Sequence, residues 1–193
     1  MDLTQGTVKE KNDRAKKMML WFGIVSLLMG FAGWTSAYIV SSSREDWASD
    51  VNLPSTFYIS TLVIIISSLT YILAKNAVKN DKQSTAGLWL LVTLGLGIAF
   101  IFLQFSGFSQ MVAEGYYFTG PTSSIKMSYV FLIAMVHIIH VAAGMISLLV
   151  VIYNQKRGKY SSKEYLGITL GATFWHFLDL LWVYLIVFMT FVK

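Results

Sequence analysis

The stretch MSYVFLIAMVHIIHVAAGMISLLVVIY, residues 127–153, decides the fold, because no charged side chain occurs between Lys126 and Lys156. An α-helix needs about 20 apolar residues to cross the roughly 30 Å hydrocarbon core of a bilayer. The apolar residues show no two-residue alternation, and the run is longer than the roughly 10 residues of a membrane barrel strand. This stretch therefore predicts a membrane-spanning helix.

Four further charge-poor stretches follow the same pattern, and the last of them contains one charge, Asp179. We therefore predict an all-α polytopic membrane protein with five transmembrane helices, near residues 18–40, 55–74, 84–108, 127–153 and 165–192. Residues 1–17 are expected to form a cytoplasmic N-terminal segment, and residues 18–193 a single transmembrane domain.

The composition agrees with a membrane protein. Of 193 residues only 13% are charged, and the mean hydropathy is +0.60, whereas soluble domains average about 25% charged residues. The chain has no cysteine, which excludes disulfides, thiolate zinc sites and iron–sulfur clusters. Its three histidines are too few to ligate two hemes and a copper.

The basic residues predict the orientation. Five helices place on one side the segments that contain Lys9, Lys11, Arg14, Lys16, Lys17, Lys75, Lys79, Lys82, Lys156, Arg157, Lys159 and Lys163. The other side has only Arg44, Lys126 and Lys193. Basic loops stay in the cytoplasm, so we predict a cytoplasmic N-terminus and an outer C-terminus. The net charge of +5 is assigned to this asymmetry and to anionic lipid, not to nucleic acid.

A few polar residues lie inside the apolar stretches. Asp179 is in the middle of the last span, where a charged carboxylate costs about 2.5–3.5 kcal/mol on insertion scales. His176 precedes it by one helical turn, and His137 and His140 share a face of the fourth span, which Gly144 continues.

These residues allow several interpretations. The histidines and Asp179 form either a hydrogen-bonded network that fixes the packing of the fourth and fifth helices, a site for a lipid headgroup or partner subunit, a metal site, or a proton path. Trp175 and Trp182 are interpreted as packing residues on either side of Asp179.

Small residues in the other spans predict helix contacts. In the second span they are the hydroxyl residues Ser60, Thr61, Ser67, Ser68 and Thr70. In the first and third spans they are glycines, which are Gly23, Gly30, Gly33, Gly95 and Gly97.

The run Trp175-His176-Phe177-Leu178-Asp179-Leu180-Leu181-Trp182 and the following Leu185 resemble the W-H-F-x-D-x-x-W-x-x-L signature of heme-copper oxidase subunit III. His137-Ile138-Ile139-His140-Val141 with Gly144 is similar to that family's H-x-x-H-V-x-x-G. Weaker similarities are Leu53-Pro54 followed by Ser60-Thr61 and Ser67-Ser68, and Phe102-Leu103-Gln104 in the third span. Together these motifs cover nearly the whole chain in the family's order.

The resemblance implies the short five-helix bacterial form of subunit III, in an inner membrane. It implies no catalytic residue and no metal or heme in this chain. The hemes and copper belong to partner subunits, of which subunit I is catalytic and subunit II is a second partner, and further oxidase or supercomplex subunits can join. The implied role is to stabilise subunit I, hold phospholipid and ease the entry of oxygen. Its site for structure, lipid or assembly comprises His137, His140, Gly144, Trp175, His176, Asp179 and Trp182, with packing residues Gly30, Gly33, Ser67, Ser68 and Gln104.

The sequence departs from the family pattern at three places. The acid that usually follows a serine in the first of these helices is replaced by Leu27 after Ser26. The acid three residues after Gln104 is replaced by Gly107, and the asparagine before Thr61 by Ser60.

Other functions remain open at this point. A quinol oxidase uses the same subunit, and the accessory protein of nitric oxide reductase shares much of the pattern. A small proton-coupled transporter that uses Asp179, and a membrane metal enzyme that uses the three histidines with Asp179, are alternatives of other classes.

Overall fold

The computed structural model describes residues 6–45, 47, 53–120 and 123–192. These residues form five helices and no strand: α1 (Val8–Ser41), α2 (Ser55–Lys79), α3 (Gln83–Ala113), α4 (Ile125–Lys156) and α5 (Leu166–Phe191). Each helix is long and apolar enough to cross a membrane. The prediction of an all-α protein with five transmembrane helices is confirmed.

Helices α1 to α4 extend beyond their predicted apolar spans, most clearly at the start of α1, whereas α5 is one residue shorter than predicted at each end. This helix begins at Val8, within the segment 1–17 that was expected to precede the first span. Thr7 and Glu10 cap it reciprocally, since the Glu10 N–H donates to Thr7 Oγ1 and the Thr7 N–H to Glu10 Oε2. Hydropathy detects only the part of a helix that lipid covers, so a charged but well-capped first turn escapes it.

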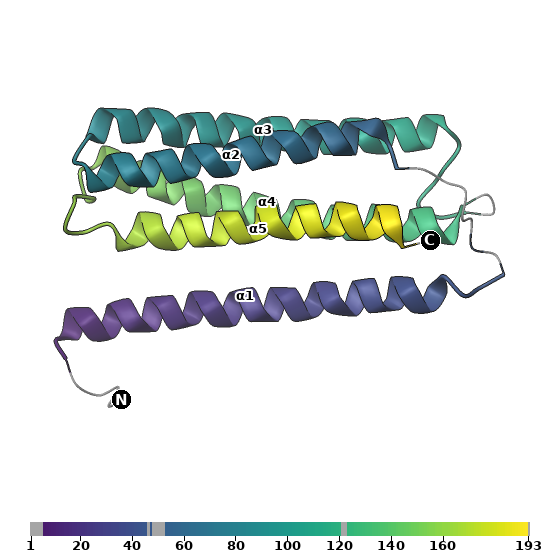
Figure 1. Cartoon of the computed structure of the whole chain (residues 1–193), viewed down its shortest axis with the longest axis horizontal. Helices are drawn as coiled ribbons and strands as arrows, with labels where there is room; N and C mark the ends of the chain where they lie inside the picture. Colours follow the sequence, from purple (N-terminus) through teal and green to yellow (C-terminus); the bar gives the residue numbers. More distant parts are fainter. Residues whose placement is uncertain (1–5, 46, 48–52, 121–122, 193) are drawn as a thin grey trace.

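The turns are short where helices pair closely. Asp81 adopts a left-handed φ of 53° between α2 and α3, a conformation that Asp tolerates better than most residues. Gly158, with φ 66°, follows the end of α4. Both turns lie at the same end of the molecule as the start of α1 (Figure 1).

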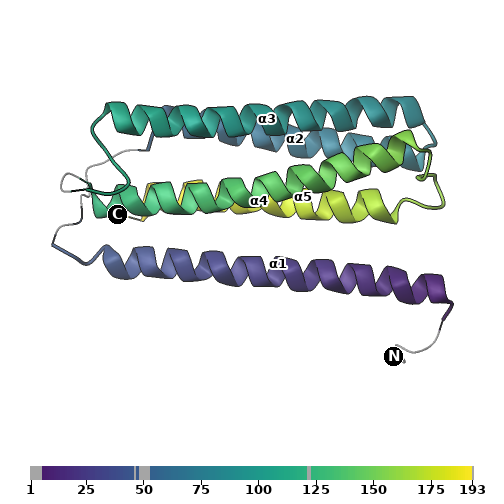
Figure 2. The ribbon, with the colours of Figure 1, turned by 180° about the vertical axis from the view of Figure 1, so that it is seen from behind.

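Four helices form a body, and α1 lies along one side of it (Figures 1 and 2). Helices α2 and α3 make the most extensive contact, while α1 contacts α4 and α5 only weakly. In the most apolar window of α1, 17% of the residues are buried, against 28–44% in the other four helices. Helix α1 is thus the least packed element of the chain.

Contacts attach α1 to the body at its start, near its middle and at its end. At its start, Lys9 forms an ion pair with Glu164, which precedes α5. Near its middle, Phe31 packs edge-on against two rings of α4, those of His137 and His140. At its end, Tyr38 lies in a cluster of rings made by Trp47, Tyr129 and Phe188.

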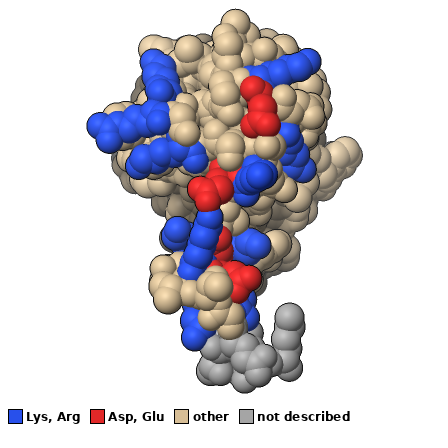
Figure 3. All heavy atoms as spheres, turned by 90° about the vertical axis from the view of Figure 1, so that its left-hand side faces the viewer, with Lys and Arg blue, Asp and Glu red and all other residues tan. Residues whose placement is uncertain are grey.

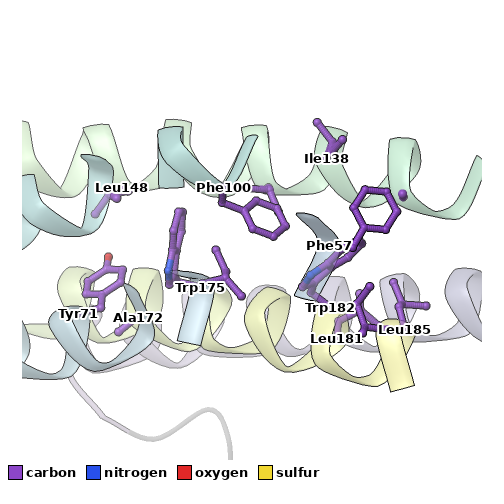
Figure 4. Close-up of a cluster of buried hydrophobic side chains, with 14 of the residues drawn as sticks. Phe57, Tyr71, Phe100, Ile138, Leu148, Ala172, Trp175, Leu181, Trp182 and Leu185 are labelled. Atoms are coloured by element: carbon purple, nitrogen blue, oxygen red, sulfur yellow. The ribbon is translucent and has the colours of Figure 1, made fainter. Parts of the chain in front are cut away.

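The core of the four-helix body is filled by aromatic rings that interlock across helices (Figure 4). Trp182 of α5 packs edge-on against Phe57 of α2 and Phe100 of α3. Trp175 lies two turns earlier on the same helix, edge-on to Tyr71. Large buried rings of this kind fix the relative positions of helices through shape, because lipid gives helices no hydrophobic reason to associate.

Basic side chains gather at the end that includes the start of α1 and the α2–α3 and α4–α5 turns (Figure 3). At this end Ser162 donates its N–H to Asp81 across the two turns, at 2.8 Å. Hydrogen bonds from Ser162 hold the pKa of Asp81 below its usual range. The neighbouring Lys9 ammonium lowers the pKa of Glu164. The three predicted basic segments therefore do meet at one end, and its cytoplasmic location stays a prediction.

Candidate functional site: a polar interface between the second and fifth helices

The hydroxyl groups of α2 lie in a row that faces two neighbouring helices. Residues three, four and seven apart share one side of a helix, so Ser60, Thr61, Ser67 and Ser68 line one side of α2. Ser60 and Thr61 both donate to the carbonyl of Phe57 in their own helix. This back-bonding makes the hydroxyls inexpensive in lipid and leaves their oxygens free to accept bonds from other helices.

The polar side chains of α5 bond to this row. The indole N–H of Trp175 donates to Ser67 Oγ at 2.9 Å, and that of Trp182 donates to Thr61 Oγ1 at 3.1 Å. His176 Nδ1 shares a hydrogen bond of 2.5 Å with Ser68 Oγ. We call these residues, together with Asp179, the α2–α5 polar interface.

Asp179 is 5% exposed, and its carboxyl group interacts with the Ser68 hydroxyl. Within the described part of the chain, Asp179 Oδ2 and His176 Nε2 are buried without a hydrogen-bond partner. Ser68 therefore lies between an imidazole and a carboxyl group, each of which keeps one unused polar atom. The interface is polar enough to orient the two helices, and it is incompletely satisfied.

Helix α3 joins α2 through separate polar contacts. Gln104 Nε2 donates to Ser60 Oγ at 2.7 Å, and Thr93 shares a 2.8 Å hydrogen bond with Thr70. All four side chains are buried. Helix α2 is thus the hub to which both α3 and α5 are hydrogen-bonded.

Among the described residues, the histidines of α4 are not hydrogen-bonded to this interface, although one of them packs against it. His137 is completely buried, and neither of its ring nitrogens has a partner in the described residues. Its ring stacks on Trp182 with 5.0 Å between centroids, and Phe31 and Phe100 meet it edge-on. His140 Nδ1 contacts the carbonyl of Val136, one turn earlier in its own helix, at 2.8 Å.

The interpretation of one hydrogen-bonded network joining α4 to α5 is therefore wrong. Helices α4 and α5 meet through ring stacking and close packing, while His176 and Asp179 face α2. Among the described residues, no group of three or more His, Asp or Glu side chains is placed to hold a metal. The i, i+3 spacing paired His137 with His140 on α4 and His176 with Asp179 on α5, but it carried no information on which helix each pair faces.

Two glycines bring helices against Trp175. A Cβ added to Gly144 of α4 would lie 2.8 Å from Leu178 Cδ1 and 3.4 Å from Trp175 Cε3. A Cβ on Gly97 of α3 would lie 2.9 Å from Trp175 Cη2. Because its indole also bonds Ser67, Trp175 contacts α2, α3 and α4 at once. All four helices of the body therefore meet at Trp175.

The other glycines of interest differ in their surroundings. A Cβ added to Gly30 or Gly33 of α1 would have none of the described residues of other helices within 4 Å. Gly107 replaces an acid of the family pattern, and the ring of Phe57 lies in the space that a side chain at this position would need. An aromatic ring of α2 thus occupies the space of the missing side chain.

Two features of the site were not predicted from the sequence. Phe31 and Phe100 enclose His137, but apolar rings in an apolar span give no local signal. Thr93 is the hydrogen-bond partner of Thr70. Thr93 was detectable in principle, because it is a lone hydroxyl in the middle of the third span.

The chain is similar in sequence to subunits of known oxidases. The family model described as cytochrome c oxidase subunit III matches residues 47–192. Cytochrome c oxidase subunit 3 of Bacillus sp. (strain PS3) is 28% identical over 93% of this chain and 85% of its own, and that of Alkalihalophilus pseudofirmus is 24% identical over 94% and 87%.

Quinol oxidase subunits are similar as well. Cytochrome bo(3) ubiquinol oxidase subunit 3 of Pseudomonas aeruginosa is 32% identical over 65% of this chain. The match spans 58% of that relative's length. The residues that the family model matches, 47–192, include the whole α2–α5 polar interface and the stacked His137. This chain belongs to the cytochrome c oxidase subunit III family of integral membrane proteins.

Proposed function

We propose that this chain is the non-catalytic subunit III of a heme-copper terminal oxidase in a bacterial inner membrane. In this proposal it packs against catalytic subunit I, with subunit II and further oxidase or supercomplex subunits in the same assembly. Hemes and copper belong to the partners. The chain itself stabilises subunit I and holds phospholipid.

One observation carries the proposal: the polar side chains of the α5 motif are used in holding the bundle together. Both indole N–H groups and one nitrogen of His176 bond to α2 hydroxyls. These bonds join α5 to α2, which supports an architectural role for the motif. The site residues predicted from the family are proposed to serve assembly in this way.

The outer face of α1 is suited to pack against a helix of a partner subunit. Gly30 and Gly33 are open, and the apolar side chains of Phe22, Val25 and Met29 are exposed on this helix. Small residues let helices approach closely in lipid, where van der Waals packing drives association. We place subunit I, or another oxidase subunit, against this face.

The test is purification of the tagged full-length chain from its native membrane in a mild detergent. We expect an oxygen-consuming complex with heme absorbance and one copy of this chain per catalytic subunit. Recovery of the intact chain without heme, together with solute or ion flux in vesicles that Asp179→Asn abolishes, would instead support the transporter alternative.

The same preparation identifies the electron donor, since relatives of both the cytochrome c and the quinol type match this chain. Reduced cytochrome c and a quinol are each supplied to the purified complex. The donor that sustains oxygen uptake assigns the oxidase class. An assembly that reduces nitric oxide but not oxygen would assign the chain to the reductase alternative.

Easier oxygen entry is the last part of the proposal. Oxygen is apolar and dissolves better in lipid than in water, so a lipid-covered subunit beside the catalytic one favours its supply. Oxidase with and without this subunit should show equal turnover at saturating oxygen and a higher apparent KM for oxygen in the depleted form. Equal KM values would remove oxygen delivery from the proposal.

A further inference from the structure

A cleft opens where the basic start of α1 passes the α4–α5 turn. It has a volume of about 790 Å³, and its charged lining consists of Lys9, Lys16, Lys17, Lys159, Lys163, Asp13 and Glu164. Among the described residues, the ion pairs here are Lys9 with Glu164 and Lys16 with Asp13. Lys17, Lys159 and Lys163 add positive charge that these pairs do not neutralise.

A second cavity of about 450 Å³ continues from the cleft toward the middle of the molecule. The two share Lys16, Tyr160 and Gly167 in their linings. Deeper in, the second cavity is lined mainly by apolar side chains of three helices, including Leu20, Val150 and Phe174. On α5 the two linings extend from Leu166 to Phe174, roughly 12 Å along the helix axis at 1.5 Å per residue.

We infer that this cleft binds one anionic phospholipid, with its headgroup among the lysines and an acyl chain between α1, α4 and α5. This lipid is the phospholipid of the proposed function, here given a binding place and a headgroup charge. Its binding rests on the proposed function only in requiring a membrane. The apolar continuation favours a lipid over a free phosphate ion, which needs no such channel.

The opposite end of α1 provides an internal comparison. A cavity of about 430 Å³ lies there between Trp34 and the start of α4, and its lining includes no Lys or Arg. Both ends therefore leave space beside α1, but only the cleft combines that space with basic side chains. Lysines at a membrane surface attract anionic headgroups by about 1 kcal/mol each, so selectivity for anionic lipid is expected at the basic end.

The lipid also accounts for the loose attachment of α1. This helix contacts the body at its start, near its middle at Phe31 and at its end, and the second cavity lies between the first two contacts. A lipid in this space joins α1 to α4 and α5 without direct contacts between their side chains.

The test counts lipids bound to the full-length chain in a non-ionic detergent by native mass spectrometry, with phosphatidylglycerol and phosphatidylcholine as probes. The wild-type chain should retain one phosphatidylglycerol in preference to phosphatidylcholine. Replacing Lys159 and Lys163 by Gln should reduce this preference about thirty-fold, at about 1 kcal/mol per lysine. The matched control replaces Lys75 and Lys82, which belong to the same basic end but do not line the cleft.

A second variant distinguishes a lipid from a headgroup or ion alone. Ser147→Trp places a bulky ring in the second cavity and should weaken both lipids while leaving the preference between them unchanged. The inference would be overturned if the wild-type chain retained the two lipids equally, or if both lysine pairs lost the preference equally. It would also be overturned if the chain bound inorganic phosphate and Ser147→Trp did not affect that binding. Circular dichroism verifies that each variant is folded. Co-purification with heme, measured separately, reports on the proposed function, so the two failures are distinguishable.

Discussion

At the scale of single residues, hydrogen bonds from α5 indoles to α2 hydroxyls orient the two helices. Trp175 bonds Ser67 and Trp182 bonds Thr61, two turns apart along the same interface. Interhelical hydrogen bonds in a bilayer contribute only about 0.6 kcal/mol on average, so their main effect is on geometry. A pair of bonds at this spacing fixes both the axial position and the rotation of α5 against α2.

Ser67→Ala tests the contribution of one such bond. It leaves the Trp175 N–H buried without its acceptor, so we expect a loss of about 0.6–1.7 kcal/mol in the free energy of unfolding. The measurement is unfolding of the full chain in mixed micelles by a denaturing detergent. Ser109→Ala is the control, since Ser109 is exposed and donates to the Phe105 carbonyl of its own helix. Equal stability of the two variants would contradict the assignment.

At the scale of helices, close packing around Trp175 fixes α3 and α4 against α5. Gly97 and Gly144 hold the indole from two sides. Helices approach this closely only where a side chain is absent, and a rigid ring cannot move aside as the end of a flexible side chain can. The fit of glycine to ring thus determines which helices are neighbours.

Gly97→Ala and Gly95→Ala form a matched pair on α3. The Cβ at Gly97 would lie 2.9 Å from Trp175 Cη2, whereas nothing lies within 4 Å of one at Gly95. We expect Gly97→Ala to destabilise by about 1–3 kcal/mol through overpacking. Gly95→Ala should be neutral or stabilising, because alanine favours helix over glycine. Thermal unfolding in detergent measures both changes, and similar losses at the two positions would show that the ring moves freely.

The turns between helices supply a pH-dependent contact. Hydrogen bonds from Ser162 lower the pKa of Asp81 in the folded chain, so this carboxylate stabilises the fold above its unfolded pKa of about 3.9. That contribution disappears as the pH falls through the lower, folded pKa. Wild type should therefore unfold at a higher temperature than Asp81→Asn near pH 6, and the two should converge only once the pH has fallen below the folded pKa, which is lower than the unfolded value. Asparagine keeps the left-handed turn accessible. A difference that persists at low pH would exclude the carboxylate as its source.

The number and approximate position of the helices could be predicted from the sequence, because charged residues interrupt five apolar stretches. The start of α1 could not, since its first turns are charged and hydropathy does not detect them. Which helix each polar face contacts could not be predicted from the sequence either. The spacing of His137 and His140 puts them on one face, but only the packed rings of Phe31, Phe100 and Trp182 explain why that face excludes Asp179. Spacing describes one helix, and neighbours depend on the shapes of all five.

At the scale of the whole molecule, the chain is a four-helix body with a loosely attached first helix. The body is held by buried rings and by α2 hydroxyls, while α1 keeps open glycines and exposed apolar side chains. This division suits a subunit whose body is stable alone and whose first helix meets lipid or a partner. An architectural role then predicts that damage to the core affects assembly before turnover.

The most direct test of this central claim is Asp179→Ala in the assembled oxidase. The variant removes the carboxyl group that interacts with Ser68, so it weakens the α2–α5 polar interface. The measurement is the amount of this chain, and the oxygen turnover, per heme in the purified complex. We predict a lower ratio of this chain to heme with unchanged initial turnover per heme. Full occupancy of the subunit combined with lost turnover would contradict the account.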